Sequence, residues 1–159
     1  MNWGHYLFGF SGRINRAKYW LWILLYVIAA IIAAAVIYAI NSPMAGNIVQ
    51  LVFSIAAFVS SLAIVTKRLH DRAKSAWWLL LYVLIPTILL GVGGGLAMYG
   101  MMTGGMLAGS ADLNEMQLIG GILVLVASVF LIWAFVDLAC LRGTIGANQY
   151  GPDPLEGRV

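Results

Sequence analysis

Charged side chains are scarce in this sequence. Lys, Arg, Asp and Glu make up 9% of the 159 residues, whereas hydrophobic residues make up 62%. A soluble domain carries about 25% charged residues, and with far fewer it lacks the polar surface to cover its core. The composition therefore excludes an ordinary soluble protein and predicts a single integral membrane domain over residues 1–159.

Cysteine is also nearly absent, since Cys140 is the one thiol, and a single cysteine excludes an intramolecular disulfide. The sequence lacks the HExxH, CxxC, Ser-His-Asp and phosphate-cradling patterns of common catalytic and metal sites. We therefore expect no catalytic residues, no metal site and no cofactor. The net charge of +3 comes from cations grouped at segment ends, which favours a topological role over a nucleic-acid partner.

Four apolar runs are long enough to cross a bilayer, which takes about 20 helical residues. They cover residues 19–40, 48–66, 76–96 and 117–141. The predicted fold class is all-α, an integral membrane four-helix bundle, and Pro86 should disturb the third helix. Residues 97–116 are rich in Gly and Met, and we expect a loop there. A helical extension and a re-entrant segment fit the same composition, and the sequence does not decide between them.

The two ends of the chain have a different character. In residues 1–18, the apolar side chains of Trp3, Tyr6, Leu7 and Phe10 share one face if the stretch is helical. This spacing predicts an amphipathic segment lying in the membrane interface. Residues 142–159 are polar and rich in Gly and Pro, which predicts an irregular tail.

All nine Lys and Arg residues lie in alternate segments between the apolar runs. They are Arg13, Arg16, Lys18, Lys67, Arg68, Arg72, Lys74, Arg142 and Arg158. Short segments rich in Lys and Arg stay in the cytoplasm. The pattern therefore predicts four spans with both termini cytoplasmic. The densest group lies in residues 67–75, and because charges are costly in hydrocarbon we expect a loop at the membrane face there.

Three stretches of the sequence carry specific motifs. They are residues 10–20 (FSGRINRAKYW), 68–78 (RLHDRAKSAWW) and 143–154 (GTIGANQYGPDP). In this order they resemble the motifs of a family of small bacterial inner-membrane proteins, domain of unknown function 805, which includes the YhaH-type proteins. Lys67 stands where the family often has Arg, and Ala76 where it often has Gly. The resemblance implies a bacterial cytoplasmic (inner) membrane, and it implies no activity.

The polar residues of these motifs all belong to the predicted cytoplasmic face. They are Arg13, Arg16, Arg68, His70, Asp71, Arg72, Asn148, Tyr150 and Asp153. One hypothesis is a basic pocket for an anionic group, either an anionic phospholipid of the bilayer or an acidic segment of a partner protein. The alternative is a structural network in which Asp71 and Asp153 pair with arginines. His70 and Asp71 point about 100° apart on a helix, which argues against a catalytic dyad.

Asp137 is the one acidic residue inside a predicted span, about five residues from its cytoplasmic end. Ionisable residues within spans are candidates for function, so Asp137 is a proton-site candidate for a small transporter or proton-coupled channel. Four short spans would line a pore only as a homo-oligomer. The structural alternative is an ion pair with Arg142 or Lys67, or a water-exposed position.

The main functional hypothesis is a non-enzymatic membrane protein that acts through its basic cytoplasmic face. A transporter using Asp137 and a membrane enzyme acting on a lipid headgroup are the alternatives. The ligand, the partner, the oligomeric state and the physiological process are left open by the sequence.

Overall fold

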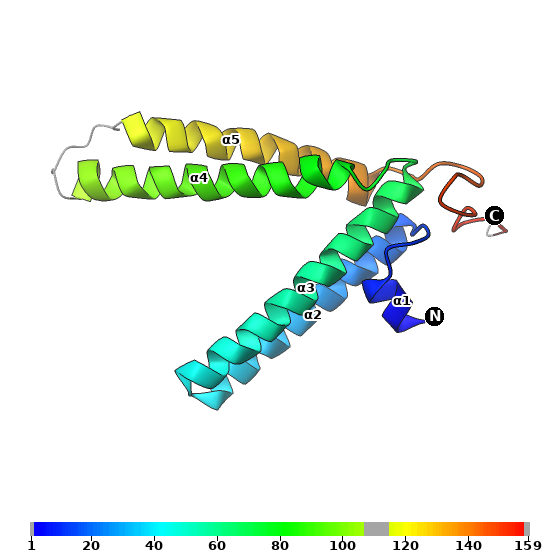
Figure 1. Ribbon diagram of the computed structural model, residues 1–159, viewed down its shortest axis with the longest axis horizontal. Coiled ribbons are helices and arrows are strands. Elements are labelled where there is room, and N and C mark those ends of the chain that lie inside the picture. Colours follow the sequence, from blue (N-terminus) through cyan, green and yellow to red (C-terminus); the bar gives the residue numbers. More distant parts are fainter. Residues whose placement is uncertain (1, 107–114, 158–159) are drawn as a thin grey trace. The chain divides into compact units, whose positions relative to one another are not determined.

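The computed structural model describes residues 2–106 and 115–157, and its helices are drawn in Figure 1. Contacts divide the chain into two compact units. Unit 1 contains Met1–Ala76 and Leu138–Val159, and unit 2 contains Trp77–Asp137. The elements in chain order are α1 (Trp3–Phe8), α2 (Arg16–Ile40), α3 (Pro43–Asp71), η1 (Leu80–Leu84), α4 (Ile85–Gly100), η2 (Met101–Met106), α5 (Glu115–Phe135) and η3 (Val136–Cys140).

Four of the helical stretches are long and apolar enough to cross a membrane. They are Arg16–Ile40, Pro43–Asp71, Leu80–Thr103 and Glu115–Cys140, of 24 to 29 residues. At about 1.5 Å per residue, even the shortest exceeds the roughly 30 Å of a hydrocarbon core. No strand occurs in the described part of the chain. The all-α class with four long apolar helices is therefore confirmed, whereas the single domain stays a prediction.

Unit 1 is built on the α2–α3 hairpin, whose helices run antiparallel side by side (Figure 1). The turn is short because Asn41 adopts the left-handed conformation, with φ 48°, and Pro43 opens α3. Proline suits this position because the first helical amide has no partner within the helix. At the other end of the hairpin, the Asn15 side chain caps α2 by accepting a hydrogen bond from the Lys18 amide at 2.9 Å.

The first eighteen residues form a six-residue helix and a loop. The Asn2 side chain caps α1 through the His5 amide at 3.2 Å, and α1 ends before Gly9. Helix α1 packs on α3, with Tyr6 buried against Ile14 and Ile64. Phe10 lies outside the helix, so the four-residue apolar face predicted for this segment is shorter than expected.

Helix α3 ends in a Schellman motif. The amide of Ala73 donates to the His70 carbonyl at 3.0 Å, and that of Lys74 donates to the Leu69 carbonyl at 2.9 Å. Ala73 adopts the left-handed conformation in this turn, with a φ of 55°, at a position where glycine is the usual residue. The expectation of a loop over residues 67–75 is therefore wrong for residues 67–71, which form the last turns of α3.

Unit 2 contains α4 and α5, which pack closely together. A Cβ atom added to Gly120 would lie 2.5 Å from the Gly93 carbonyl oxygen and from the Ala97 amide nitrogen, so glycine is required for this approach. The π-helical η1 directly precedes the buried Pro86. The third long helix thus departs from α geometry where proline removes an amide donor.

The expectation of a loop over residues 97–116 is corrected in part. Residues 97–100 continue α4, and Met101–Met106 extend it as the π-helical η2. Residues 115 and 116 already belong to α5. Residues 107–114 lie outside the described residues. The helical extension was the right alternative for residues 97–106, because consecutive glycines near a helix end lower its stability without preventing it.

Candidate functional site

A buried ionic network lies in unit 1, where the end of α3 meets the loop before α2 and the C-terminal segment. The Asp71 carboxylate accepts a hydrogen bond from Nε of Arg13 at 3.1 Å, and it pairs on its other oxygen with the Arg68 guanidinium. The side chains of Arg13, Arg68 and Asp71 are 1%, 0% and 3% exposed. One carboxylate therefore serves two buried arginines.

The Arg68 guanidinium also binds three backbone carbonyl groups. It donates to Leu138 at 2.7 Å, to Ile14 at 3.4 Å and to Leu141. Leu138 and Leu141 lie at the end of the last helix, where carbonyl groups have no helical donor, so Arg68 satisfies them. This explains how a charge expected in a surface loop is buried instead, because a buried ion is tolerated when its hydrogen-bonding groups are paired.

Arg13 holds the C-terminal segment in the same way. Its guanidinium donates to the carbonyl groups of Thr144 at 2.7 Å, Gly146 at 2.7 Å and Gly151 at 3.2 Å. Gly143 lies directly on the Asp71 carboxylate, since an added Cβ would be 2.0 Å from its Oδ2. The three sequence motifs therefore meet in one place, tied together by side chains of the first two and carbonyl groups of the third.

His70, Tyr150 and Asn148 form a second layer of this network. The rings of His70 and Tyr150 stack with centroids 3.9 Å apart and planes within 4°. His70 Nδ1 lies 3.3 Å from the Gly12 carbonyl oxygen, and the Asn148 side chain donates to the His70 carbonyl at 2.9 Å. His70 thus contacts the N-terminal loop and Asp71 contacts the arginines, so the two adjacent residues do not act as a dyad.

Asp153 has a different role from the one predicted. Its carboxylate accepts hydrogen bonds from the backbone amides of Leu155 at 2.9 Å and Gly146 at 3.0 Å. These two bonds hold the pKa of Asp153 below its ordinary value. The predicted pairing with arginines is therefore right for Asp71 and wrong for Asp153, which instead stabilises the turn of the C-terminal segment.

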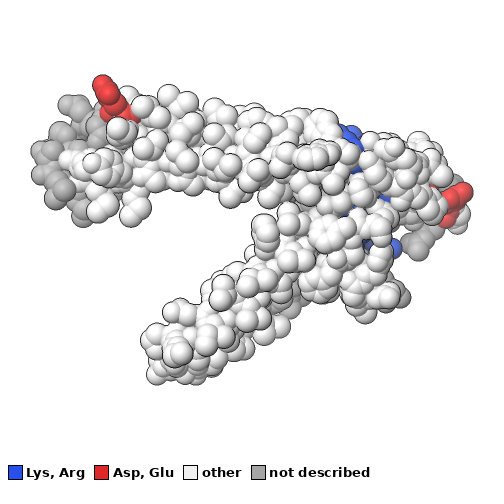
Figure 2. Space-filling model, viewed as in Figure 1, with Lys and Arg blue, Asp and Glu red and all other residues white. Residues whose placement is uncertain are grey.

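Arg16 and Arg72 lie at the edge of the network. Each donates to a carbonyl group of the C-terminal segment: Arg16 to Cys140 at 3.4 Å and Arg72 to Arg142. On the face drawn in Figure 2, the visible Lys and Arg atoms lie near the end of the α2–α3 pair where α2 begins and α3 ends. Arg13, Arg68 and Asp71, by contrast, are already engaged with each other, and the cavity beside Asp71 measures only about 20 Å³. That cavity, which Arg16 and Arg142 also border, is too small for a phosphate group.

A second pocket offers more room, and its two lysines lie outside the predicted set. This lysine pocket, about 170 Å³ in volume, is bordered by Lys18, Lys67 and Arg13 together with Asn2 and His5. Its described lining contains no Asp or Glu. Neither lysine is in the predicted anion-binding set. Charge alone does not distinguish a lysine that borders a pocket from one that only sets the orientation of the protein in the membrane.

The two lysines of this pocket differ in their contacts. Lys67 is 2% exposed. Its ammonium donates hydrogen bonds to the carbonyl groups of Tyr6 and, at 3.0 Å, of His5. The same ammonium lies 5.6 Å from the centroid of the Tyr6 ring. It therefore caps the carbonyl end of α1. Lys18 is half-buried, lies close enough to Lys67 to repel it, and has no hydrogen bond or ion pair from its ammonium within the described residues.

Asp137 lies in unit 2, at the start of η3. It is 3% exposed, and its carboxylate accepts a hydrogen bond from the Tyr82 hydroxyl at 2.9 Å. The predicted water-exposed position is therefore wrong. Tyr82 is itself buried, and its ring contacts the Trp133 ring edge to face, with the ring centroids 5.2 Å apart. Over residues 2–106 and 115–157, no group of three or more His, Cys, Asp or Glu is placed to hold a metal ion.

Comparison with known proteins agrees with the resemblance. Over 148 residues the chain is 28% identical to inner membrane protein YhaH of Escherichia coli (strain K12), covering 92% of this chain and 87% of that protein. It is 28% identical to inner membrane protein YhaI of the same organism, covering 94% and 88%, and 28% identical to the uncharacterized protein YiiR, covering 93% and 87%. No solved structure matches the chain.

The names of these relatives and the four membrane-length helices both indicate an integral inner-membrane protein. The family model described as protein of unknown function (DUF805) matches residues 7–152, which include all three motifs up to Pro152. The chain belongs to the DUF805 family.

Proposed function

We propose that this protein is a non-enzymatic membrane protein, with both termini in the cytoplasm, that binds the phosphate of anionic phospholipids. The lysine pocket carries the proposal, because two lysines border one space whose described lining has no acidic residue. Arg13 and Arg68 are engaged by Asp71 and by carbonyl groups, and Lys67 is engaged by two carbonyl groups. Lys18 is therefore the cation that would bind the phosphate, and Lys67 would add positive charge beside it.

The proposed orientation follows from the distribution of the cations. Every Lys and Arg lies before the first span or in its first turn, at the end of the second span or between it and the third, or after the fourth. Short segments of this kind stay in the cytoplasm. The lysine pocket would then face the leaflet that carries a negative surface potential, where each nearby cation gains about 1 kcal/mol from anionic lipid.

Lys18 is placed to meet a headgroup at the bilayer surface. It directly precedes Tyr19, where the uncharged run of α2 begins. Tyr and Trp residues prefer the level of the headgroups, and Tyr19, Trp20 and Trp22 follow at once. A phosphate between Lys18 and Lys67 would relieve the repulsion between the two ammonium groups and give Lys18 a hydrogen-bonding partner.

Native mass spectrometry of the detergent-extracted protein tests the proposal. The protein is titrated with phosphatidylglycerol or with phosphatidylcholine of the same chains, and the ratio of retained lipids is measured. We expect Lys18→Gln to lower the preference for phosphatidylglycerol about fivefold, which corresponds to about 1 kcal/mol for one cation. Arg142→Gln is the matched control, because Arg142 is exposed at the same end and does not border the lysine pocket.

The control separates a site from general attraction. An equal loss in both variants would mean that the lipid responds only to net charge, and no loss in Lys18→Gln would mean that the lysine pocket binds no phosphate. Either result contradicts the proposal.

A second candidate function is proton-coupled transport through Asp137. The burial of Asp137 and its contact with the Tyr82 hydroxyl favour it, since ionisable residues within spans are candidates for proton pathways. Proton flux into proteoliposomes should then fall in Asp137→Asn and be little changed in Glu115→Gln, at the exposed start of α5. Equal flux in Asp137→Asn and the unmodified protein would remove this candidate.

A further inference from the structure

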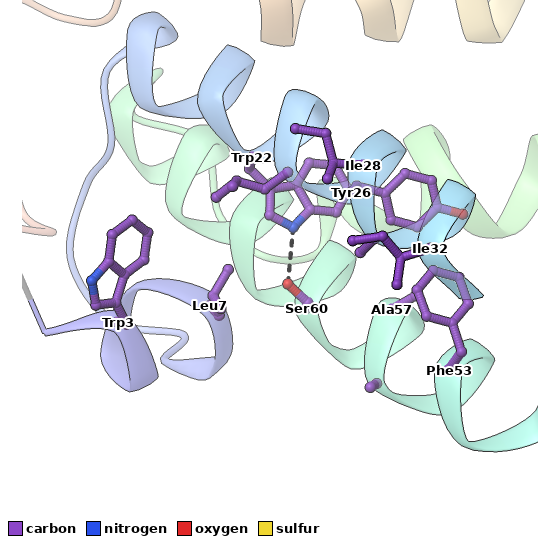
Figure 3. Close-up of a pocket in the computed structure, with 12 residues that line it drawn as sticks. Trp3, Leu7, Trp22, Tyr26, Ile28, Ile32, Phe53, Ala57 and Ser60 are labelled. Atoms are coloured by element: carbon purple, nitrogen blue, oxygen red, sulfur yellow. Dashed lines mark hydrogen bonds between the residues drawn. The ribbon is translucent and has the colours of Figure 1, made fainter. Parts of the chain in front are cut away.

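A large apolar groove runs along the α2–α3 pair in unit 1. Its volume is about 590 Å³, within the range of small-molecule sites. Figure 3 shows Trp22, Tyr26 and Ile32 reaching into it from α2, and Phe53 and Ala57 from α3. Trp3 and Leu7 of α1 approach it from the end that carries the cations.

The groove offers almost no polar group to a ligand. The Trp22 indole nitrogen donates to the Ser60 hydroxyl at 2.9 Å, so these two polar groups satisfy each other (Figure 3). The other polar side-chain groups of the lining are the Trp3 indole N–H and the Tyr26 hydroxyl. The remaining lining is aliphatic or aromatic, with Ala29, Ala56 and Ala57 leaving room between the larger side chains. A polar ligand would lose its hydration here without a hydrogen bond in return, so the groove suits a hydrocarbon chain.

The register of α2 joins this groove to the lysine pocket. Trp22, Leu25, Ala29 and Ile32 line the groove at the spacing of one helical face. Lys18 stands four residues before Trp22, on the same face and one turn closer to the helix start. Helix α1 borders both spaces, with His5 at the lysine pocket and Leu7 at the groove. A cationic site therefore lies at the head of an apolar one.

We infer that this surface holds one anionic phospholipid, with its phosphate at Lys18, beside the charge of Lys67, and one acyl chain in the groove. The inference rests on the proposed function for the phosphate and adds the acyl chain as a second part of recognition. A charged head followed by an apolar chain is complementary to a lysine followed by an apolar channel. A helix from a second copy would match the channel and leave the ammonium of Lys18 without a counter-charge.

The test fills the groove without altering a charge. Ala29→Leu/Ala56→Leu places larger side chains at two groove positions, and Ala35→Leu/Ala39→Leu makes the same change at exposed positions of α2 outside it. Both variants and Lys18→Gln are titrated with dioleoyl phosphatidylglycerol and with dioleoyl phosphatidylcholine in native mass spectrometry. We expect the groove variant to lose retained phosphatidylglycerol, as Lys18→Gln does, and the control to retain it.

The other outcomes overturn the inference in distinguishable ways. If Lys18→Gln loses phosphatidylglycerol and the groove variant does not, the proposed headgroup site stands and the acyl-chain site is wrong. If neither variant loses phosphatidylglycerol, the headgroup site and the acyl-chain site are both wrong. If the groove variant loses both lipids equally, the groove takes chains without regard to the headgroup. If it loses only the dimer signal of the protein, the groove is an interface between copies.

Discussion

Replacing Asp71 by Asn removes the charge that two buried arginines share. The substitution keeps the size of the side chain, so it leaves no cavity, and its effect reports the charge and the hydrogen bonds. Arg68 is 0% exposed and the Arg13 side chain is 1% exposed, so water does not replace the lost carboxylate charge at either guanidinium. Breaking a buried ion pair by removing one partner costs about 3–5 kcal/mol. For a chain of this length, that corresponds to a loss of roughly 6–20 °C in Tm.

The matched control is Asp153→Asn, the same chemical change at a carboxylate that accepts two backbone amides in the C-terminal turn. Losing one hydrogen bond there should cost about 1 kcal/mol. Thermal unfolding of each variant in the same mild detergent, followed by circular dichroism at 222 nm, gives the Tm values. If the Tm of Asp71→Asn fell no further than that of Asp153→Asn, the buried arginines would not depend on the Asp71 charge, and the account of the network would be refuted.

Three further substitutions test the backbone geometry by the same measurement. Gly143→Ala should lower the Tm, because its Cβ would lie 2.0 Å from a carboxylate of Asp71 that two arginines hold in place, and such overpacking costs about 1–3 kcal/mol. Ala73→Gly should raise the Tm by about 2–4 °C, because the left-handed conformation at φ 55° costs alanine about 1 kcal/mol. Gly120→Ala should lower the Tm through its contact with the α4 backbone, whereas Gly121→Ala, with nothing within 4 Å of its added Cβ, should be neutral or stabilising by up to about 1 kcal/mol. A Tm for Gly143→Ala at or above that of the unmodified protein, a lower Tm for Ala73→Gly, or equal effects at the two α5 glycines would each contradict the corresponding contact.

The helical part of the fold was accessible from the sequence because it depends on hydrophobic length. Four apolar runs are about as long as a bilayer is thick, and each overlaps one of the four long helices. The helix ends were less accessible. Residues 67–71 carry cations that suggest a loop, yet they continue α3, because Arg68 and Asp71 find their partners in segments 54 to 73 residues away.

The candidate site was predicted in its location and only partly in its roles. The motif residues do meet in unit 1, and Asp71 does pair with arginines. Composition does not reveal that the Arg13 guanidinium is engaged by three carbonyl groups whereas the Lys18 ammonium has no such partner in the part of the chain that the structure describes. The one usable signal was the position of Lys18 one helical turn before Trp22, which places a cation beside an apolar face.

The sequence by itself determined the class of the protein, because the number of apolar residues in a run and the position of its cations are properties of the chain alone. Only the tertiary structure decided which cations are structural and which border an open pocket. The physical reason is that a guanidinium buried against a carboxylate and an ammonium with no partner have the same formal charge. They differ in their hydrogen-bonding neighbours, and folding brings those neighbours from distant parts of the chain.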